Sequence, residues 1–155
     1  HLDEFDLSEL TEMVAEEAQG LAESKAVTLT AEIEPGILVK ADQTLMMRIW
    51  LNLLTNAVKY GRQQGQIWLT LKSDGKNAVG TVRDDGIGIS AAELPKIWKR
   101  FYRVNTARSS GDDSGTGLGL AMVKWMVESH GGTVSAVSTL GAGSTFSFTI
   151  PLRPS

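Results

Sequence analysis

The stretch Asn52-Leu-Leu-Thr-Asn56-Ala-Val-Lys59-Tyr60 decides how this chain is interpreted. In a helix, positions i, i+4 and i+7 project from the same side, so Asn52, Asn56 and Lys59 form one polar stripe. A neighbouring face repeats apolar side chains at helical spacing and is expected to face the core; these are Met46, Ile49, Leu53 and Ala57. A helix that needs only packing and solubility would carry charges opposite its core. An Asn-Asn-Lys stripe that ends in Tyr60 instead suggests a binding face.

The residue types of this stripe suit a nucleotide. Amide oxygens are hard ligands for Mg²⁺, which usually keeps several waters and shares phosphate oxygens with its nucleotide. Lys59 would add a phosphate contact, and Tyr60 a flat surface for a base. Taken alone, the stripe is equally typical of a capped or solvent-facing amphipathic helix. The choice between the two depends on the rest of the chain.

Composition narrows the class of protein. The 155 residues suit one domain, 1–155, with a substantial core. The net charge of −3, with both signs mixed along the chain, argues against a nucleic-acid-binding surface. The absence of cysteine excludes disulfides and thiolate metal sites. No apolar run long enough for a membrane span and no signal peptide is visible, and the chain begins at His1, so we expect a cytosolic module of a longer protein.

Periodicity and turn residues predict interleaved strands and helices. Strands are expected at 27–33, 37–40, 66–73, 77–83, 133–139 and 145–150, with a hairpin turn at Asp74-Gly75. The main helices are expected over 10–21, from Asp42 to a C′ glycine at Gly61, and over 118–130, with a short one over 90–98. The apolar stripe of the first helix is Leu10, Met13, Val14, Ala18 and Leu21, with Asp6 or Ser8 as its cap. Trp50, Trp98 and Trp125 are expected in the core, and His130 as a capping or surface histidine.

This order of elements predicts an α+β fold, a two-layer α/β sandwich. If the strands are mostly antiparallel, the three main helices cover only one face of the sheet.

Three glycine clusters follow the polar stripe. In Asp84-Asp85-Gly86-Ile87-Gly88-Ile89, glycines allow close approach at the end of a strand, and a carboxylate there can accept the exocyclic amine of a purine. Alone, this cluster is more typical of an Asp-Gly hairpin turn. Gly115-Thr-Gly117-Leu-Gly119-Leu opens the last helix, whose N-terminal N–H groups form an anion site. Gly141-Ala-Gly143-Ser144-Thr145-Phe146 alone is a tight turn.

The remaining signals favour neither a P-loop nor a dinucleotide fold. No Gly-Lys-Ser/Thr occurs, and the second glycine cluster follows a long polar loop rather than a first strand. That loop begins after Phe101-Tyr102-Arg103, contains Arg108, and is expected to be a flexible lid over about 103–116. Alone, it is equally typical of a solvated surface loop.

Taken together and in this order, the five motifs closely resemble the catalytic, ATP-binding domain of bacterial sensor histidine kinases, within the superfamily that includes gyrase, the ninety-kilodalton heat-shock chaperone and MutL-type ATPases. The resemblance runs from Phe5 to Leu152. It implies a Bergerat-type fold, with a mixed, mostly antiparallel sheet of about five strands under three helices. ATP and Mg²⁺ would bind between the sheet and the lid.

The resemblance also implies a role for each motif residue. Asn56 resembles the Mg²⁺ ligand, Asn52 and Lys59 the residues at the phosphates, and Tyr60 the residue on adenine. Asp84 resembles the carboxylate that binds the adenine amine, with Gly86, Gly88 and Ile89 around the base. Contacts to the phosphates are implied for the lid and helix start: Arg103, Arg108, Gly115, Thr116, Gly117, Leu118, Gly119 and Leu120. Ser144 or Thr145 would supply a hydroxyl at the adenine end, and Trp98 stands where the family commonly has Phe.

Asn52 separates two chemistries within this superfamily. The hydrolysing branches have a glutamate there that activates water, and an amide cannot act as a general base. A neutral imidazole needs no base, so we expect the ATP-donating half of a histidine autokinase. Neither His1 nor His130 has the expected acceptor setting, so the acceptor is expected on a dimerisation domain before residue 1. Alternatives are a serine or protein kinase of the same fold, a plain ATPase, and a degenerate module that binds no nucleotide.

The same resemblance implies the wider setting of the domain. The fragment is expected to be monomeric, without nucleic-acid or direct membrane contact, and to act on a response regulator only indirectly. The full-length protein would be a homodimeric, membrane-anchored sensor kinase with this domain in the cytoplasm.

Overall fold

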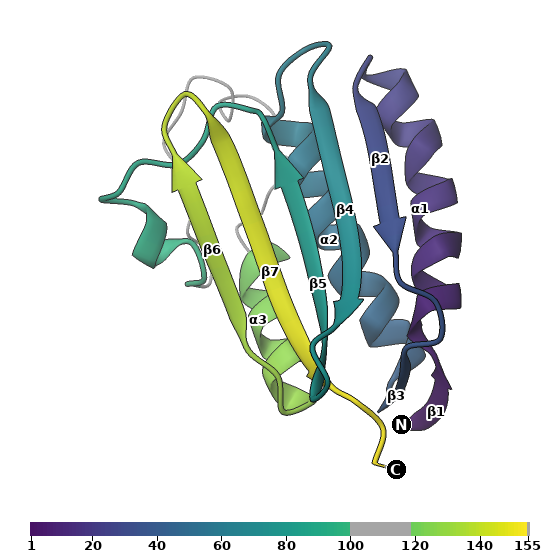
Figure 1. The fold of residues 1–155 in the computed structure, drawn as a ribbon. Coiled ribbons are helices and arrows are strands. Elements are labelled where there is room, and N and C mark those ends of the chain that lie inside the picture. Colours follow the sequence, from purple (N-terminus) through teal and green to yellow (C-terminus); the bar gives the residue numbers. More distant parts are fainter. Residues whose placement is uncertain (100–118, 155) are drawn as a thin grey trace.

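The chain folds into a five-stranded sheet with three helices packed on one of its faces (Figure 1). The structure, a computed structural model, describes residues 1–99 and 119–154. The strand order is β2 (Thr28–Ile33), β4 (Gln66–Ser73), β5 (Asn77–Asp84), β7 (Gly143–Pro151) and β6 (Val134–Thr139). Only the β2–β4 pair is parallel; the other three pairs are antiparallel. The predicted α+β sandwich with a mixed, mostly antiparallel sheet is confirmed.

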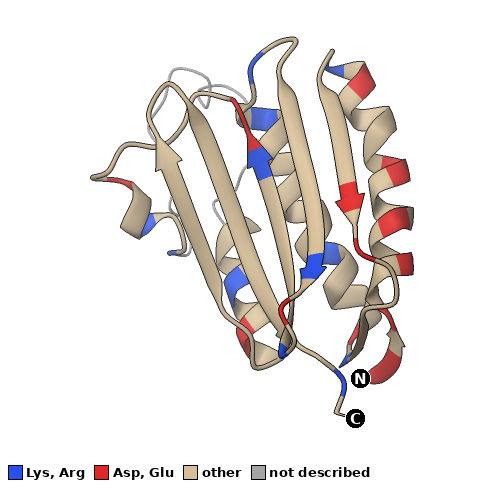
Figure 2. Cartoon of the chain, viewed as in Figure 1, with Lys and Arg blue, Asp and Glu red and all other residues tan. Residues whose placement is uncertain are grey.

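The helices α1 (Leu7–Ser24), α2 (Gln43–Tyr60) and α3 (Gly119–Ser129) lie behind the sheet, with α2 between the other two (Figure 1). Asp6 and Asp42 cap α1 and α2, and each accepts a backbone N–H three residues ahead. In Figure 2, acidic residues recur along the ribbon of α1, whereas β6 and β7 hold no charged residue. Because α2 lies between α1 and α3, it is the central helix of this layer.

The core lies between α2 and the sheet. The predicted apolar face of α2 is fully buried, and Trp50 and Leu54 extend it. Trp50 meets Phe148 of β7 edge to face, with 4.9 Å between ring centroids. Burying each large side chain of this kind contributes about 1.5–3 kcal/mol. This packing fixes the rotation of α2, and with it the direction of the Asn stripe.

Two apolar residues predicted in the core are exposed. Trp125 is 57% exposed because α3 turns Val123, Met126 and Val127 toward the sheet. Met13 is 48% exposed because the buried stripe of α1 runs through Leu10 and Val14 instead. Trp50 is buried as predicted, and Trp98 is partly buried against Phe146.

Three local predictions also need correction. The helix expected over 90–98 is only a 3₁₀ helix, η1 (Leu94–Lys96), because Pro95 has no N–H with which to continue the helical hydrogen bonding after the bond from Leu94 to the Ser90 carbonyl. Gly61 ends α2 in extended backbone rather than in a left-handed C′ conformation. A strand absent from the prediction, β1 (Asp3–Asp6), pairs with β3 (Leu38–Ala41) in a small second sheet.

His130 links two helices. Its Nε2 accepts the backbone N–H of Asp42 at 3.1 Å, so its Nδ1 carries the proton and donates to the Met126 carbonyl at 2.7 Å. The side chain therefore joins the C-terminal end of α3 to the N-cap of α2. This is a more specific role than the predicted surface or capping histidine.

Two glycines offer opposite tests of the packing. A Cβ at Gly80 would collide with the buried Phe148 ring and lie 2.8 Å from Trp50 Cη2, whereas nothing lies within 4 Å of a Cβ at Gly20 in α1. We expect Gly80→Ala to lower the free energy of unfolding by about 1–3 kcal/mol, because neither buried ring can move. Gly20→Ala should raise it by about 0.5–1 kcal/mol through helix propensity. Urea unfolding measures both, and equal effects would contradict this account of the core.

Candidate functional site

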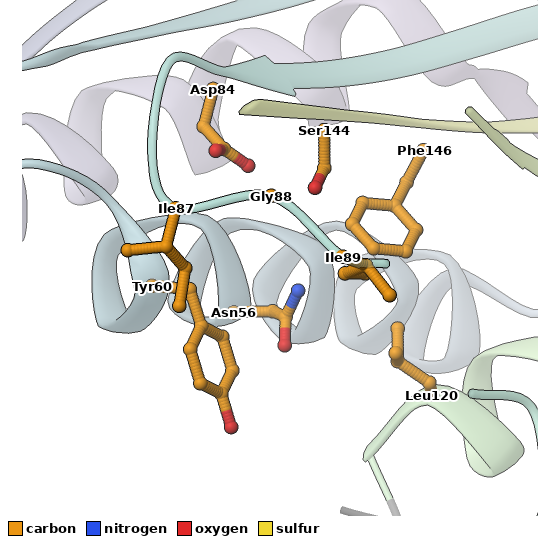
Figure 3. A pocket seen from close by; sticks show the side chains of 9 residues that line it. All are labelled: Asn56, Tyr60, Asp84, Ile87, Gly88, Ile89, Leu120, Ser144 and Phe146. Atoms are coloured by element: carbon orange, nitrogen blue, oxygen red, sulfur yellow. The ribbon is translucent and has the colours of Figure 1, made fainter. Parts of the chain in front are cut away.

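A pocket opens between α2, the loop after β5, the start of α3 and the start of β7 (Figure 3). Two predicted residues of α2 line it, and Asp84 stands opposite them at the end of β5. The full lining is Asn56, Tyr60, Asp84, Ile87, Gly88, Ile89, Leu120, Ser144 and Phe146. Polar groups on two sides and apolar walls between them suit a flat, partly polar ligand.

Asp84 is the most unusual group in the pocket. It is only 4% exposed. The backbone N–H of Gly86 donates to its Oδ1 at 2.8 Å. Burial raises the pKa of Asp84 to about 6; backbone N–H groups of Gly86 and Ser144 oppose that rise, and the nearby Asp85 charge adds to it. Burying a carboxylate is costly, and a buried group whose pKa is shifted in this way in a pocket is a candidate for function.

The loop after Asp84 is held by close backbone contacts that require glycine. A Cβ at Gly86 would collide with the Tyr60 carbonyl at the end of α2. Gly88 has a left-handed φ of 73°, and a Cβ there would collide with the Thr139 carbonyl of β6. The loop is thus wedged between the end of α2 and the β6–β7 turn.

Hydrogen bonds fix the same loop from both sides. The N–H of Ile87 donates to the Tyr60 carbonyl at 3.2 Å, and the N–H of Gly141 donates to the Ile87 carbonyl at 2.7 Å. Arg62 links the start of this loop to the β6–β7 turn, because its guanidinium donates hydrogen bonds to the carbonyls of Asp85 and Gly141. The pocket wall is therefore well ordered by contacts of the protein itself.

Only two of the four residues predicted on the binding face of α2 line the pocket. Asn56 and Tyr60 line the pocket, one turn apart, whereas Asn52 and Lys59 are half-buried outside its lining. The Lys59 ammonium lies 5.3 Å from the Tyr60 ring centroid. Asn52 lies one helical turn before Asn56, on the same side of α2.

The structure gathers most of the predicted site residues that it describes. Asn56, Tyr60, Asp84, Gly88, Ile89, Leu120 and Ser144 line one pocket, while Asn52, Lys59, Gly86, Gly119 and Thr145 do not. Arg103, Arg108, Gly115, Thr116, Gly117 and Leu118 lie outside the described residues, as does the predicted lid, and remain predictions.

Strand alternation separates Ser144 from Thr145. Successive side chains of β7 point to opposite faces, so Ser144 and Phe146 face the pocket and Thr145 faces the uncovered side of the sheet. The prediction missed Phe146 and Ile87 as lining residues. The alternation beyond Ser144 could have indicated Phe146.

A sequence profile described as "Histidine kinase-, DNA gyrase B-, and HSP90-like ATPase" matches residues 41–154, which hold the pocket. The chain belongs to this ATPase family. As a member of the family, the domain binds ATP.

Named relatives of this ATPase domain are sensor kinases. It is 38% identical over 149 residues to the sensor histidine kinase TmoS of Ectopseudomonas mendocina, covering 96% of this chain and 15% of TmoS. It is 35% identical over 146 residues to the sensor histidine kinase YclK of Bacillus subtilis, covering 94% of this chain and 31% of YclK. The chain thus spans less than a third of either relative. These matches confirm the resemblance to the catalytic ATP-binding domain of a bacterial histidine kinase.

Solved structures agree with this assignment. The mycobacterial sensor histidine kinase MprB superposes with a TM-score of 0.85 at 27% identity, covering 99% of this chain and all of that one. Full-length ShkA, solved in complex with AMPPNP, superposes with a TM-score of 0.84 at 30% identity, covering 99% of this ATPase domain and 32% of ShkA. Within residues 1–99 and 119–154, no helix is both long and apolar enough to cross a membrane.

The raised pKa of Asp84 can be tested by its effect on the stability of the protein without nucleotide. Because the pKa of Asp84 rises from 3.8 to about 6 on folding, the folded chain holds this proton more tightly than the unfolded chain. The contribution of Asp84 to the free energy of unfolding should therefore fall as the pH rises from about 4 to about 6. Asp84→Asn should flatten this dependence and raise the free energy of unfolding at pH 7 by about 1–3 kcal/mol.

Urea unfolding across this pH range is the measurement, with Glu16→Gln as the matched control. Glu16 is exposed on α1, so this variant makes the same change in net charge away from the pocket. A destabilised Asp84→Asn protein, or an unchanged pH dependence, would contradict the electrostatic account.

Proposed function

We propose that this domain binds Mg-ATP in the pocket and donates the γ-phosphoryl group to a histidine on a separate dimerisation domain of a two-component sensor kinase. The observation that carries the proposal is the placement of buried Asp84 across one pocket from Asn56. A carboxylate at one end and a carboxamide at the other suit the two ends of a nucleotide. The domain would be residues 1–155 of a longer chain.

The adenine end is assigned to Asp84 and the apolar walls around it. Its carboxylate would accept a hydrogen bond from the exocyclic amine, and the gain from that bond would offset the cost of burying the charge. Ile87, Ile89 and Phe146 would enclose the flat base, with the Ser144 hydroxyl beside the carboxylate (Figure 3). Tyr60 would cover the edge of the base from α2.

The phosphate end is assigned to Asn56 and to the neighbouring turns of α2. The Asn56 carboxamide faces the pocket, and its oxygen is a hard ligand. One such protein ligand fits Mg²⁺, which retains waters and phosphate oxygens and would neutralise charge on the transferred group. Asn52 and Lys59 would act at the phosphates, as their place on the same helix suggests.

The proposed reaction is phosphoryl transfer rather than hydrolysis, because Asn52 cannot act as a general base. Asn52 has no basic lone pair with which to activate water. A neutral imidazole nitrogen can attack the γ-phosphorus directly: a P–N bond forms as the P–O bond to ADP breaks. The protein then has to position the reactants and balance charge, and these are the tasks for which its amides, lysine and arginines are suited.

The acceptor histidine is assigned to another domain. Both ring nitrogens of His130 are engaged in hydrogen bonds, to Asp42 and Met126, so His130 offers no free nucleophile. The lengths of TmoS and YclK leave room for further domains. A histidine-bearing helical dimerisation domain would receive the phosphoryl group and pass it to a response regulator. The whole kinase would be a membrane-anchored homodimer with this domain in the cytoplasm.

Calorimetry with a non-hydrolysable ATP analogue tests the two ends of the site. Asp84→Asn should weaken binding by about 10- to 100-fold, because a hydrogen bond to a charged group is lost. Asn56→Ala should abolish most of the dependence of affinity on Mg²⁺. Glu16→Gln should bind like the wild type. Unchanged affinity in Asp84→Asn would refute the adenine assignment.

Phosphoryl transfer is tested by mixing this domain with the dimerisation domain of its own kinase and labelled ATP. We expect the label on the helical partner, in an acid-labile bond, and only slow release of free phosphate. Acid-stable label would indicate a serine or protein kinase instead. Rapid multiple-turnover phosphate release would indicate an ATPase, and label on this chain itself would contradict the assignment of the acceptor.

A further inference from the structure

The guanidinium of Arg62 bonds to two backbone carbonyls and, among the described residues, to no carboxylate. Its Nε donates to the Asp85 carbonyl at 2.5 Å, and its Nη2 donates to the Gly141 carbonyl at 2.6 Å. The ion pairs found within residues 1–99 and 119–154 do not include Arg62. The Asp85 carboxylate instead accepts the backbone N–H of Gln66 at 2.9 Å. The charge of Arg62 therefore acts on the two carbonyls.

The Asp85 carbonyl belongs to the same peptide unit as the N–H of Gly86. No peptide bond of the described residues is cis, so the C=O and the N–H of this unit point in opposite directions. On one side, the carbonyl accepts a hydrogen bond from Arg62. On the other side, the N–H donates to Oδ1 of Asp84 at 2.8 Å. The Asp85–Gly86 peptide unit thus lies between the guanidinium and the buried carboxylate.

A cation at the carbonyl end of a peptide unit strengthens the donor at its other end. The guanidinium polarises the carbonyl, and the N–H of the same unit becomes a better hydrogen-bond donor. The N–H of Gly86 already lowers the pKa of Asp84 against the effect of burial. Arg62 can therefore favour the ionised form of Asp84 from outside the pocket lining.

Other charged groups of the described chain give Asp84 no comparable support. The neighbouring Asp85 carboxylate raises the pKa of Asp84. The helix α2 brings the titratable Tyr60 to the pocket, whereas Lys59 lies outside the lining. Arg83 precedes Asp84 on β5, and strand alternation turns it to the opposite face of the sheet. The strands β6 and β7, the adjacent half of β4 and the first turn of α3 hold no charged residue.

We propose that Arg62 is a positioning residue that aims the Gly86 N–H at Asp84 through the Asp85–Gly86 peptide unit. The carboxylate is thereby kept ionised and oriented as an acceptor, although Arg62 itself does not line the pocket. The second bond, to Gly141 in the β6–β7 turn, holds the guanidinium in place. The inference rests on the proposed binding of the adenine amine at Asp84.

The first test uses the protein without nucleotide. NMR follows the Gly86 amide and the ¹³C-labelled carboxyl of Asp84 from about pH 4 to about pH 8. Arg62→Met keeps an apolar stem but has no charge and no donor. We expect the Gly86 signal to move and the pKa of Asp84 to rise above its wild-type value of about 6, because the supporting donor is weaker. Arg48→Met, exposed on α2, makes the same change in net charge and should match the wild type.

Two milder variants separate this role from simple packing. Arg62→Lys keeps a charged donor, but an ammonium does not span two carbonyls as a planar guanidinium does. It should therefore restore part of the wild-type behaviour. Arg62→Gln keeps a neutral donor and loses the charge, so the pKa of Asp84 should rise. This variant serves as the test if Arg62→Met does not fold.

The second test compares the binding of adenosine and ADP, followed by NMR titration. Arg62→Met should weaken both ligands by the same factor, about three- to tenfold, the size of an impaired hydrogen bond. The factors should be equal because the two ligands share the base, and only ADP carries phosphates. Arg48→Met should bind both ligands like the wild type.

The outcomes distinguish this inference from the proposed function. An unchanged pKa of Asp84 and an unchanged Gly86 signal in Arg62→Met, or in Arg62→Gln if the former does not fold, would overturn the role of Arg62. A loss confined to ADP would also overturn it, because Arg62 would then act on the phosphates. Failure of the wild type to bind either ligand would instead overturn the proposed site, while the measurements without ligand would still decide the role of Arg62.

Discussion

The close approach of Gly86 to the Tyr60 carbonyl is the contact on which the site depends. It brings the end of α2 against the loop after β5, with no room for a side chain between them. The N–H of Ile87 satisfies the Tyr60 carbonyl, one of the last carbonyls of the helix, which would otherwise lack a partner. Asn56 and Tyr60 of the helix and Asp84 of the strand then face each other across one pocket. The spacing between the two ends of the proposed nucleotide site is thus set by backbone, not by flexible side chains.

The pocket carries a stability cost that the core offsets. Asp84 is buried, and among the residues that the structure describes its side chain is held by backbone N–H groups rather than by an opposite charge. The edge-to-face contact of Trp50 with Phe148 and the buried face of α2 supply apolar contacts behind it. The loop after Asp84 is also fixed by hydrogen bonds from Arg62 and Gly141. The geometry of the proposed adenine end is therefore set by contacts within the protein, which reduces the ordering that binding requires.

Local patterns in the sequence predicted the sheet, the helices and much of the pocket. Helical spacing placed Asn56 and Tyr60 on one side of α2, and the Asp-Gly motif placed Asp84 at a strand end; the structure brings these together. What failed depends on contacts between distant segments. The strand β1 forms only by pairing with β3, and Trp125 is exposed because of how α3 turns on the sheet. Gly61 is extended, without the left-handed turn that its position suggested. No local rule indicated that Ile87 would face the pocket.

The two hairpin turns of the sheet differ in how much change they can accept. The turn at Gly75 joins β4 to β5 at the end of the sheet remote from Asp84, and nothing lies within 4 Å of a Cβ built there. The turn at Gly141 is bonded to Ile87 and Arg62, and a Cβ at the adjacent Gly143 would collide with the Asp84 carbonyl. A peptide or reporter group inserted at the first turn would leave the pocket intact, whereas a change in length at the second would move its wall. Of the two turns, only the one at Gly75 can therefore be lengthened without disturbing the pocket.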